Sequence, residues 1–225
     1  MHRILNIAGN ENNNVDFIEQ PRADFIFITS VKADIKIISD LLEEKEFSLF
    51  KNNLRALDVS NLITNSQIDN YFLKTINYAK VVVLRLFGDK GTWSYGIEEL
   101  IKWKDLNSNR TLLILSGTEE QDLSLNELSS IDLNTSIKIT LLLRSGGREN
   151  YRRFLYCLTY LISPKSNIPT KYTSNVCYPD PYQYEWKDEK GFKVGIISYK
   201  ALFLANEIDL SNEIISQLRS VGLSP

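Results

Sequence analysis

A run of four apolar residues, Val81-Val82-Val83-Leu84, constrains the fold of this chain more than any other feature of its sequence. A strand with one face in water alternates apolar and polar residues, whereas a parallel strand that helices cover on both faces is apolar throughout. The run therefore predicts a strand over 81–86 in the centre of a parallel sheet. Parallel sheets occur in folds in which strands and helices alternate along the chain.

Short apolar runs and segments of helical periodicity alternate along most of the sequence. A helix is predicted over 68–79, because its apolar residues recur at intervals of three and four. The further predicted strands cover 4–8, 24–29, 54–59, 111–115 and 193–199, and the further helices cover 33–46, 149–162, 210–221 and a segment that starts near Ile97. Right-handed crossovers between such units give an α/β fold with a doubly wound, mostly parallel sheet of the Rossmann or flavodoxin kind.

Residues 131–145 fit two structures. The alternation of Ile137-Lys138-Ile139-Thr140-Leu141 is typical of a strand, but Asn134 or Thr135 could cap a helix that ends before Gly146. Propensity alone favours the strand.

Four prolines between residues 164 and 181, among many Ser, Asn and Tyr residues, interrupt the periodicity. We therefore divide the chain into an α/β domain over 1–163, a linker over 164–192 and a second unit over 193–225. The second unit holds one strand and one helix, and a crossover helix normally leads back into a parallel neighbouring strand. We expect this unit to be the incomplete start of a second α/β domain.

The composition excludes several classes of function. The 26 Lys and Arg residues nearly balance 28 Asp and Glu residues and the pI is about 5.6, so no overall positive field attracts nucleic acid. The only histidine is His2 and the only cysteines are Cys157 and Cys177, which excludes a Cys/His zinc site and a His-assisted nucleophile. No apolar stretch approaches the ~20 residues that cross a bilayer. We expect a cytoplasmic protein that binds no metal, nucleic acid or membrane.

Ligands of open parallel sheets bind beyond the carboxyl ends of the strands, so residues there are the first candidates for a site. Arg85 interrupts the apolar run over 81–87 near that end, and Trp93 and Tyr95 follow it before the next helix. A cation beside helix N–H groups and aromatic rings could hold an anionic or flat ligand. The alternative is structural: Arg85 pairs with a nearby acid, and the two aromatic side chains pack over the edge of the sheet.

Weaker candidates lie elsewhere in the sequence. Tyr199 and Lys200 end the strand predicted over 193–199, and a lysine beside a tyrosine serves proton transfer only if burial lowers the pKa of the lysine. An exposed lysine at a strand end is the simpler interpretation. The glycines over 116–118 and 145–148 match no phosphate-binding motif and indicate ordinary turns. The basic residues over 148–153, with Glu149 among them, indicate a solvated helix face that carries an ion pair.

Several segments are similar to the amino-terminal part of the large subunit of cobaltochelatase, in the family that it shares with the large subunit of magnesium chelatase. They are Val81-Val82-Val83-Leu84-Arg85-Leu86-Phe87-Gly88, Trp93-Ser94-Tyr95-Gly96-Ile97-Glu98, Gly146-Gly147-Arg148-Glu149-Asn150, Val194-Gly195-Ile196-Ile197-Ser198-Tyr199-Lys200-Ala201 and Leu218-Arg219-Ser220-Val221-Gly222-Leu223-Ser224-Pro225. Their order and spacing agree as well, and the resemblance covers nearly the whole chain. It implies a helix over 131–145. Within or beside these segments we take as candidates for ligand or partner binding Arg85, Trp93, Tyr95, Glu98, Tyr199 and Lys200. None is assigned a catalytic role.

Members of this family are far longer than this chain. They act with two smaller subunits, one an AAA+ ATPase that supplies the requirement for ATP and magnesium, to insert a divalent metal into a tetrapyrrole. The cobalt branch acts on a corrin of the hydrogenobyrinic acid type on the way to cobalamin. The resemblance therefore implies a part of an ATP-dependent cobaltochelatase, with the rest of the large subunit and the two smaller subunits as partners and the tetrapyrrole as substrate. It implies a structural or recognition part that is not catalytically competent alone, because the metal-handling residues are expected downstream.

The chain departs from the family pattern in three places. Family members usually have Arg at the position of Lys200, a Ser-Gly pair near Ala205-Asn206, and Tyr-His where this chain has Cys177-Tyr178. Each change would weaken a site built there. The residues themselves leave a second hypothesis open, a stand-alone α/β module that binds a small anionic or aromatic ligand around Arg85 and the aromatic residues that follow it.

Overall fold

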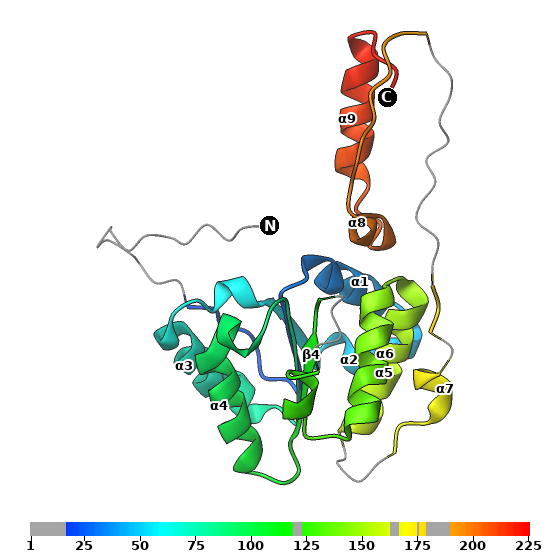
Figure 1. The fold of residues 1–225 in the computed structure, drawn as a ribbon. Coiled ribbons are helices and arrows are strands. Elements are labelled where there is room, and N and C mark those ends of the chain that lie inside the picture. The colour runs from blue at the N-terminus through cyan, green and yellow to red at the C-terminus, as the bar shows by residue number, and fades with distance from the viewer. Residues whose placement is uncertain (1–16, 119–122, 163–166, 175, 179–189) are drawn as a thin grey trace, which may run out of the picture.

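The computed structural model describes residues 17–118, 123–162, 167–174, 176–178 and 190–225. These residues form one parallel sheet of four strands in the order β2-β1-β3-β4 (Figure 1). The strands are β1 (Phe25–Thr29), β2 (Leu54–Asp58), β3 (Val81–Leu86) and β4 (Thr111–Ser116). All six residues of β3 are buried and the strand pairs on both sides, with β1 and with β4. The prediction of a central parallel strand over 81–86 is confirmed.

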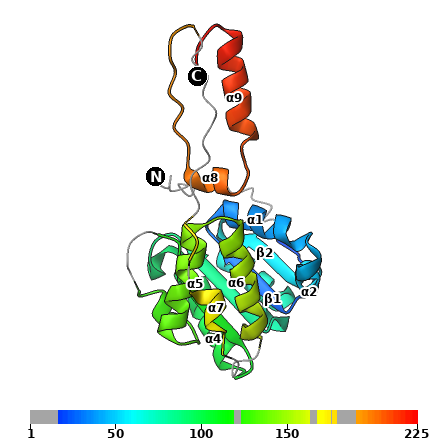
Figure 2. The ribbon, with the colours of Figure 1, turned by 90° about the vertical axis from the view of Figure 1, so that its right-hand side faces the viewer.

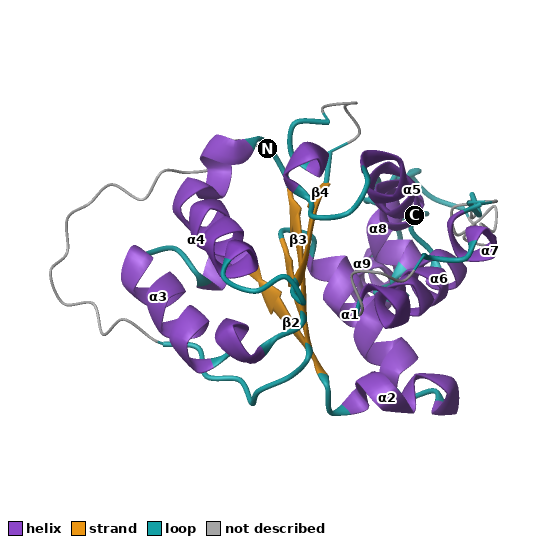
Figure 3. Cartoon of the chain, turned by 90° about the horizontal axis from the view of Figure 1, so that it is seen from below, coloured by secondary structure: helices purple, strands orange, loops and turns teal. Residues whose placement is uncertain are grey.

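Helices cover both faces of the sheet, as in a doubly wound α/β fold. Figure 3 shows α3 and α4 on one face and α1, α2, α5 and α6 on the other. The helices of the described residues are α1 (Lys32–Leu42), α2 (Ser48–Lys51), α3 (Asn65–Lys74), α4 (Ser94–Asp105), α5 (Leu133–Ser145), α6 (Arg148–Leu161), α7 (Thr170–Thr173), α8 (Lys200–Leu204) and α9 (Asp209–Ser220). Short 3₁₀ turns lie between them: η1 (Lys45–Phe47), η2 (Val59–Asn61), η3 (Ile76–Tyr78), η4 (Lys90–Trp93) and η5 (Asn126–Leu128).

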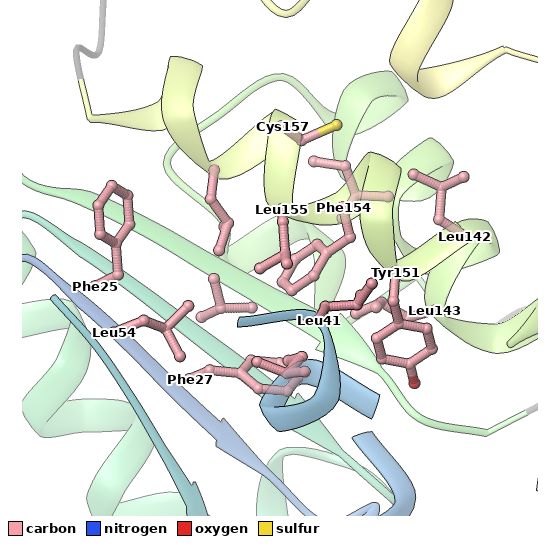
Figure 4. Packing of buried hydrophobic residues seen from close by; sticks show 14 of the residues in the cluster. Phe25, Phe27, Leu41, Leu54, Leu142, Leu143, Tyr151, Phe154, Leu155 and Cys157 are labelled. Carbon is pink, nitrogen blue, oxygen red and sulfur yellow. The ribbon is translucent and has the colours of Figure 1, made fainter. Parts of the chain in front are cut away.

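Successive residues of each strand enter two separate cores, because side chains alternate across a strand. Phe25 and Phe27 of β1 lie in the core with α1 and α6, whereas Ile26 and Ile28 lie in the core with α3 and α4. Figure 4 shows the first core, in which the ring of Phe27 lies 5.5 Å from that of Phe154. The same alternation fixes the face on which each polar side chain of a strand lies.

Residues 133–145 form helix α5, so the helix implied by the resemblance for 131–145 is confirmed and the strand that propensity favours is wrong here. The side chain of Asp132 accepts a hydrogen bond of 2.9 Å from the backbone N–H of Thr135 and caps α5. Gly146 ends the helix with φ of 69°. Between these ends Ile139 and Leu142 are completely buried against the sheet, and this burial outweighs local strand propensity.

Two predicted helices are shorter than expected. The helix predicted over 33–46 ends at Leu42, and Glu44 beyond it binds Arg148 and Arg152 of α6 instead of facing only solvent. The helix predicted over 68–79 ends at Lys74, and the chain continues as η3. Its break coincides with the buried Thr75, whose hydroxyl group donates to the carbonyl of Gln20.

The C-terminal unit of the described residues, 190–225, projects beyond the carboxyl ends of the strands (Figures 1 and 2). The predicted strand over 193–199 is wrong: the segment forms a single parallel bridge, between Lys193 and Ser224. Its apolar residues find no neighbouring strand among the described residues, and an isolated extended segment cannot form a ladder. Helix α9 confirms the helix predicted over 210–221. The strand predicted over 4–8 lies outside the described residues.

Part of the predicted linker packs against the first unit. Tyr172 of α7 stacks on Tyr156 of α6 with 4.8 Å between the ring centroids. Asn150 of α6 binds both the backbone N–H and the carbonyl of Cys177. The described stretch up to residue 178 is therefore attached to α6. In the described ranges, no helix has both the length and the apolar character that a membrane span requires.

Candidate functional site

A cavity of about 600 Å³ lies between the carboxyl ends of β1, β3 and β4 and helix α8. Its walls come from the segment after β1, the last residues of β3, the turn after β4, the turn between α5 and α6, and residues 199–204. This is the edge at which open parallel sheets bind their ligands. A larger cavity, of about 780 Å³, lies within the C-terminal unit and is lined mainly by apolar residues. We take the cavity of about 600 Å³ as the candidate site, because the candidate residues Arg85, Tyr199 and Lys200 line it.

Arg85 forms a buried ion pair at the base of the cavity. Its Nη1 lies 2.6 Å from Oδ1 of Asp34 in the first turn of α1, and 3.2 Å from the hydroxyl group of Tyr151 of α6. The Tyr151 hydroxyl donates to the same carboxylate oxygen, and Thr29 donates to the other oxygen at 2.7 Å. All four side chains are at most 5% exposed. They tie the end of β1, the end of β3 and two helices together beneath the cavity.

The charges of this cluster stabilise each other. Burial by itself lowers the pKa of Arg85, but the attraction of Asp34 and the bond with Tyr151 outweigh burial and raise that pKa, so the guanidinium stays charged. Burial, followed by the field of Asp34, raises the pKa of Tyr151 far above its usual range. The phenol therefore stays protonated and remains a donor to the carboxylate.

Tyr199 and Lys200 reach the same cavity from the C-terminal unit, although more than a hundred residues separate them from Arg85. Both side chains are exposed, and Tyr199 keeps 68% of its surface in contact with solvent. Lys200 thus resembles the exposed lysine of the simpler interpretation, although it does not end a strand. In the structure these two residues line the same cavity as Arg85. From the sequence alone, they and Arg85 were separate candidates.

Trp93, Tyr95 and Glu98 lie elsewhere. Trp93 is buried among the residues of the second core, and its indole N–H donates to the carbonyl of Leu62 at 3.0 Å. Tyr95 donates to Asp69 at 2.6 Å, and this hydrogen bond together with partial burial raises the pKa of Tyr95 to about 12. Glu98 is an exposed residue of α4. None of the three lines the cavity.

The separation of Arg85 from Trp93 follows from strand alternation. Arg85 lies on the face of β3 that carries Val81 and Val83, whereas Trp93 and α4 pack on the face that carries Val82. The structural interpretation therefore describes Arg85, which pairs with an acid, and Trp93, which is buried in the second core, whereas Tyr95 is partly buried and donates to Asp69 of α3.

Sequence reasoning missed Asp34 and Tyr151, the two partners of Arg85. Asp34 is one of several acids in the helix predicted over 33–46 and Tyr151 is one of eleven tyrosines, so neither is distinctive in the sequence. One signal pointed towards Asp34: it follows a predicted strand within a few residues, which places it at the carboxyl edge of the sheet.

The glycine turns beside the cavity have structural roles. The backbone N–H of Gly117 donates to the carbonyl of Leu86 at 2.6 Å, and a Cβ on Gly117 would lie 2.9 Å from that oxygen. Gly146 and Gly147 have φ of 69° and 82°, which favours glycine. The interpretation of both segments as turns agrees with this geometry.

Asn206 lies in a turn near which the resemblance implies a glycine, and the turn forms without one. It ends α8 with φ of 59°, and asparagine tolerates this left-handed conformation better than most residues. The N–H of Asn206 donates to the carbonyl of Phe203, and that of Glu207 donates to the carbonyl of Leu202. These two bonds form a Schellman motif, so this departure leaves the end of α8 intact.

The fold and the cavity together define a Rossmann-like α/β protein, a four-stranded parallel sheet with a cavity at the carboxyl ends of its strands. No family model matches the chain. Its sequence is similar to the aerobic cobaltochelatase subunit CobN of Pseudomonas aeruginosa, 28% identical over 106 residues, which are 47% of this chain and 8% of that protein. It is also similar to the aerobic cobaltochelatase subunit CobN of Sinorhizobium sp, 22% identical over an alignment of 242 residues that covers 99% of this chain and 19% of that protein.

A solved structure agrees with these relatives. The catalytic subunit of cobaltochelatase from Mycobacterium tuberculosis matches 92% of this chain and 16% of its own length, with a TM-score of 0.53 and 16% identity, which shows a shared fold. The resemblance to the large subunit of cobaltochelatase is confirmed. The chain spans less than a fifth of the length of each curated relative that it matches.

Proposed function

We propose that this chain acts as a recognition and scaffold part of a cobaltochelatase large subunit. The observation that carries the proposal is the extent of the likeness, because one CobN alignment covers 99% of the chain and the structural match covers 92%. The likeness therefore includes the C-terminal unit as well as the α/β unit. The relatives have more than four-fifths of their length outside the match, and we expect the groups that handle the metal there.

In this proposal cobalt and a tetrapyrrole are the substrates of the assembled enzyme. The rest of the large subunit and two smaller subunits are the partners, and one of these partners, an AAA+ ATPase, uses ATP and magnesium. The α/β unit would contribute a rigid frame, because its central strand is buried throughout. The C-terminal unit would contribute surface for contacts, because its helix α9 buries one residue, Ile215.

A replacement experiment tests this function. The segment of the Sinorhizobium CobN subunit that matches this chain is deleted in one variant and replaced by this chain in another. Each variant is combined with the smaller subunits, and cobalt insertion into a corrin of the hydrogenobyrinic acid type is measured. We expect the deletion to abolish insertion and this chain to restore it to within about tenfold of the parent, which corresponds to about 1.4 kcal/mol in the barrier.

The control is an unrelated doubly wound domain of equal length in the same position. Restoration by that domain would show that the segment serves only as a spacer. A replacement variant that assembles with its partners but inserts no cobalt would contradict the proposal.

A further inference from the structure

The candidate cavity has a cationic wall that the protein only partly neutralises. Its lining includes the charged groups of Arg85 and Lys200, and Asp34 is the one carboxylate among the lining residues. The carboxylate of Asp34 already accepts hydrogen bonds from Arg85, Tyr151 and Thr29. Within the part of the chain that the structure describes, Lys200 has no ion pair. A negative group in the cavity would meet this positive charge.

The guanidinium group of Arg85 also has a hydrogen-bond donor that the cluster does not use. Both of its hydrogen bonds in the cluster are donated by Nη1, and its buried Nε–H has no partner among the described residues. Arg85 is 4% exposed, and a buried donor without an acceptor is uncommon in native proteins. The guanidinium group of Arg85, which lines the cavity, thus has donor capacity that Asp34 and Tyr151 leave unused.

The rest of the lining fits an apolar or aromatic body. Ile37, Leu143 and Leu204 contribute aliphatic surface, and Tyr178 and Tyr199 contribute rings that are 78% and 68% exposed. The volume of about 600 Å³ falls in the range of roughly 300–1,000 Å³ that is usual for pockets of organic ligands. The lining thus combines a cationic part with an apolar part.

The glycine turns at the cavity favour a carboxylate over a phosphate. A phosphate cradle needs several free backbone N–H groups, but the N–H of Gly117 donates to Leu86 and that of Gly146 donates to Leu142. Charged side chains therefore supply the donors of this cavity.

We propose that this cavity binds an amphipathic organic carboxylate, with its charged group towards Arg85 and Lys200 and its ring or other apolar body against Tyr178 and Tyr199. The ligand would contact both the α/β unit and α8. The inference rests on the cavity alone, so it holds whether or not the chain takes part in cobalt insertion.

The test uses the purified full chain and two probes of the same size and shape, the anion 2-naphthoate and its neutral amide, with inorganic phosphate as a third probe. Binding is measured by calorimetric titration at low ionic strength. We expect saturable binding of 2-naphthoate, at least tenfold tighter than binding of the amide, and no competition from phosphate at the same concentration. Lys200→Gln should weaken binding of 2-naphthoate at least tenfold and leave binding of the amide unchanged.

Lys74→Gln is the matched control, since Lys74 is an exposed lysine at the end of α3 and does not line the cavity. Lys200 is exposed, so its replacement should leave the fold intact, which circular dichroism verifies. Absence of saturable 2-naphthoate binding at millimolar concentration, equal affinity for the amide, competition by phosphate, or an equal loss in the two lysine variants would each overturn the proposal. None of these results would alter the outcome of the replacement experiment with CobN, so the two proposals fail separately.

Discussion

At the scale of single residues, the ion pair of Arg85 and Asp34 both connects β3 with α1 and lines the candidate cavity. Their side chains are 5% and 0% exposed, so neither charge is hydrated as it would be at the surface. Such a pair contributes little more than well-packed apolar residues would, but loss of one partner leaves a buried charge without compensation. The pair therefore acts as a unit.

We predict that Asp34→Asn destabilises the protein by about 3–5 kcal/mol, because it leaves the guanidinium of Arg85 buried without its counter-charge. Urea unfolding followed by circular dichroism measures this change. The double variant Asp34→Leu with Arg85→Met should recover part of the loss, since it removes both charges together but leaves the buried hydroxyl groups of Tyr151 and Thr29 without their acceptor. The exposed pair of Lys36 and Asp40 on the same helix provides a control, and Asp40→Asn should cost about 0.5 kcal/mol or less. Equal effects of the two asparagine variants would contradict the buried pair.

At the scale of elements, the first turn of α5 decides between the two structures that the sequence of 131–145 allowed. We predict that Asp132→Ala destabilises the protein by about 0.5–2 kcal/mol, because the N–H of Thr135 loses its acceptor. Urea unfolding over a series of pH values measures the effect. The side-chain hydrogen bond with Thr135, and then the bond from its backbone N–H, lower the pKa of Asp132 in the folded protein.

This lowered pKa gives the variants of Asp132 a pH signature. A group whose pKa is lower in the folded state stabilises that state above its unfolded pKa, about 4 for Asp, and the stabilisation is lost as the pH falls through the folded pKa. The difference between the parent and Asp132→Ala should therefore shrink below about pH 4. Asp132→Asn keeps a capping oxygen without an acidic group, so it should retain most of the stability at neutral pH. A difference that stays constant with pH would contradict the role of the carboxylate.

Elements with one dominant signal were predictable from the sequence. Strands β1 to β4 were found because buried parallel strands are continuous apolar runs, and Val81 to Leu84 is the clearest of them. The segment over 193–199 has similar composition and forms no strand, because a strand exists only beside another strand, and composition does not reveal the neighbour. Local sequence thus predicts strands correctly where a neighbouring strand pairs with them. It also predicts strands, wrongly, where no such neighbour is present.

At the scale of the whole molecule, the candidate site depends on contacts that local sequence does not encode. Arg85 was visible as a charge inside an apolar run, but its partners Asp34 and Tyr151 lie 51 and 66 residues away. Strand alternation could have excluded Trp93 as its neighbour, because Arg85 shares a face with Val83 and the following helix covers the other face. The position of Lys200 at the same cavity depends on how the chain runs from one unit to the other, and local sequence does not reveal this.

The arrangement of the two units predicts a large difference in local stability. In α5, five of thirteen residues are buried, whereas α9 is twelve residues long and buries Ile215 alone, and its Leu210 is 70% exposed. Regions with few buried apolar contacts open with low free energy, without unfolding the rest of the protein. We therefore expect backbone amides of α9 to exchange with deuterium about a hundredfold faster than those of α5, measured by mass spectrometry of the full chain under native conditions. Helix α5 is a matched control because its length is similar, and equal protection of the two helices would show that α9 is held as firmly as the core of the α/β unit.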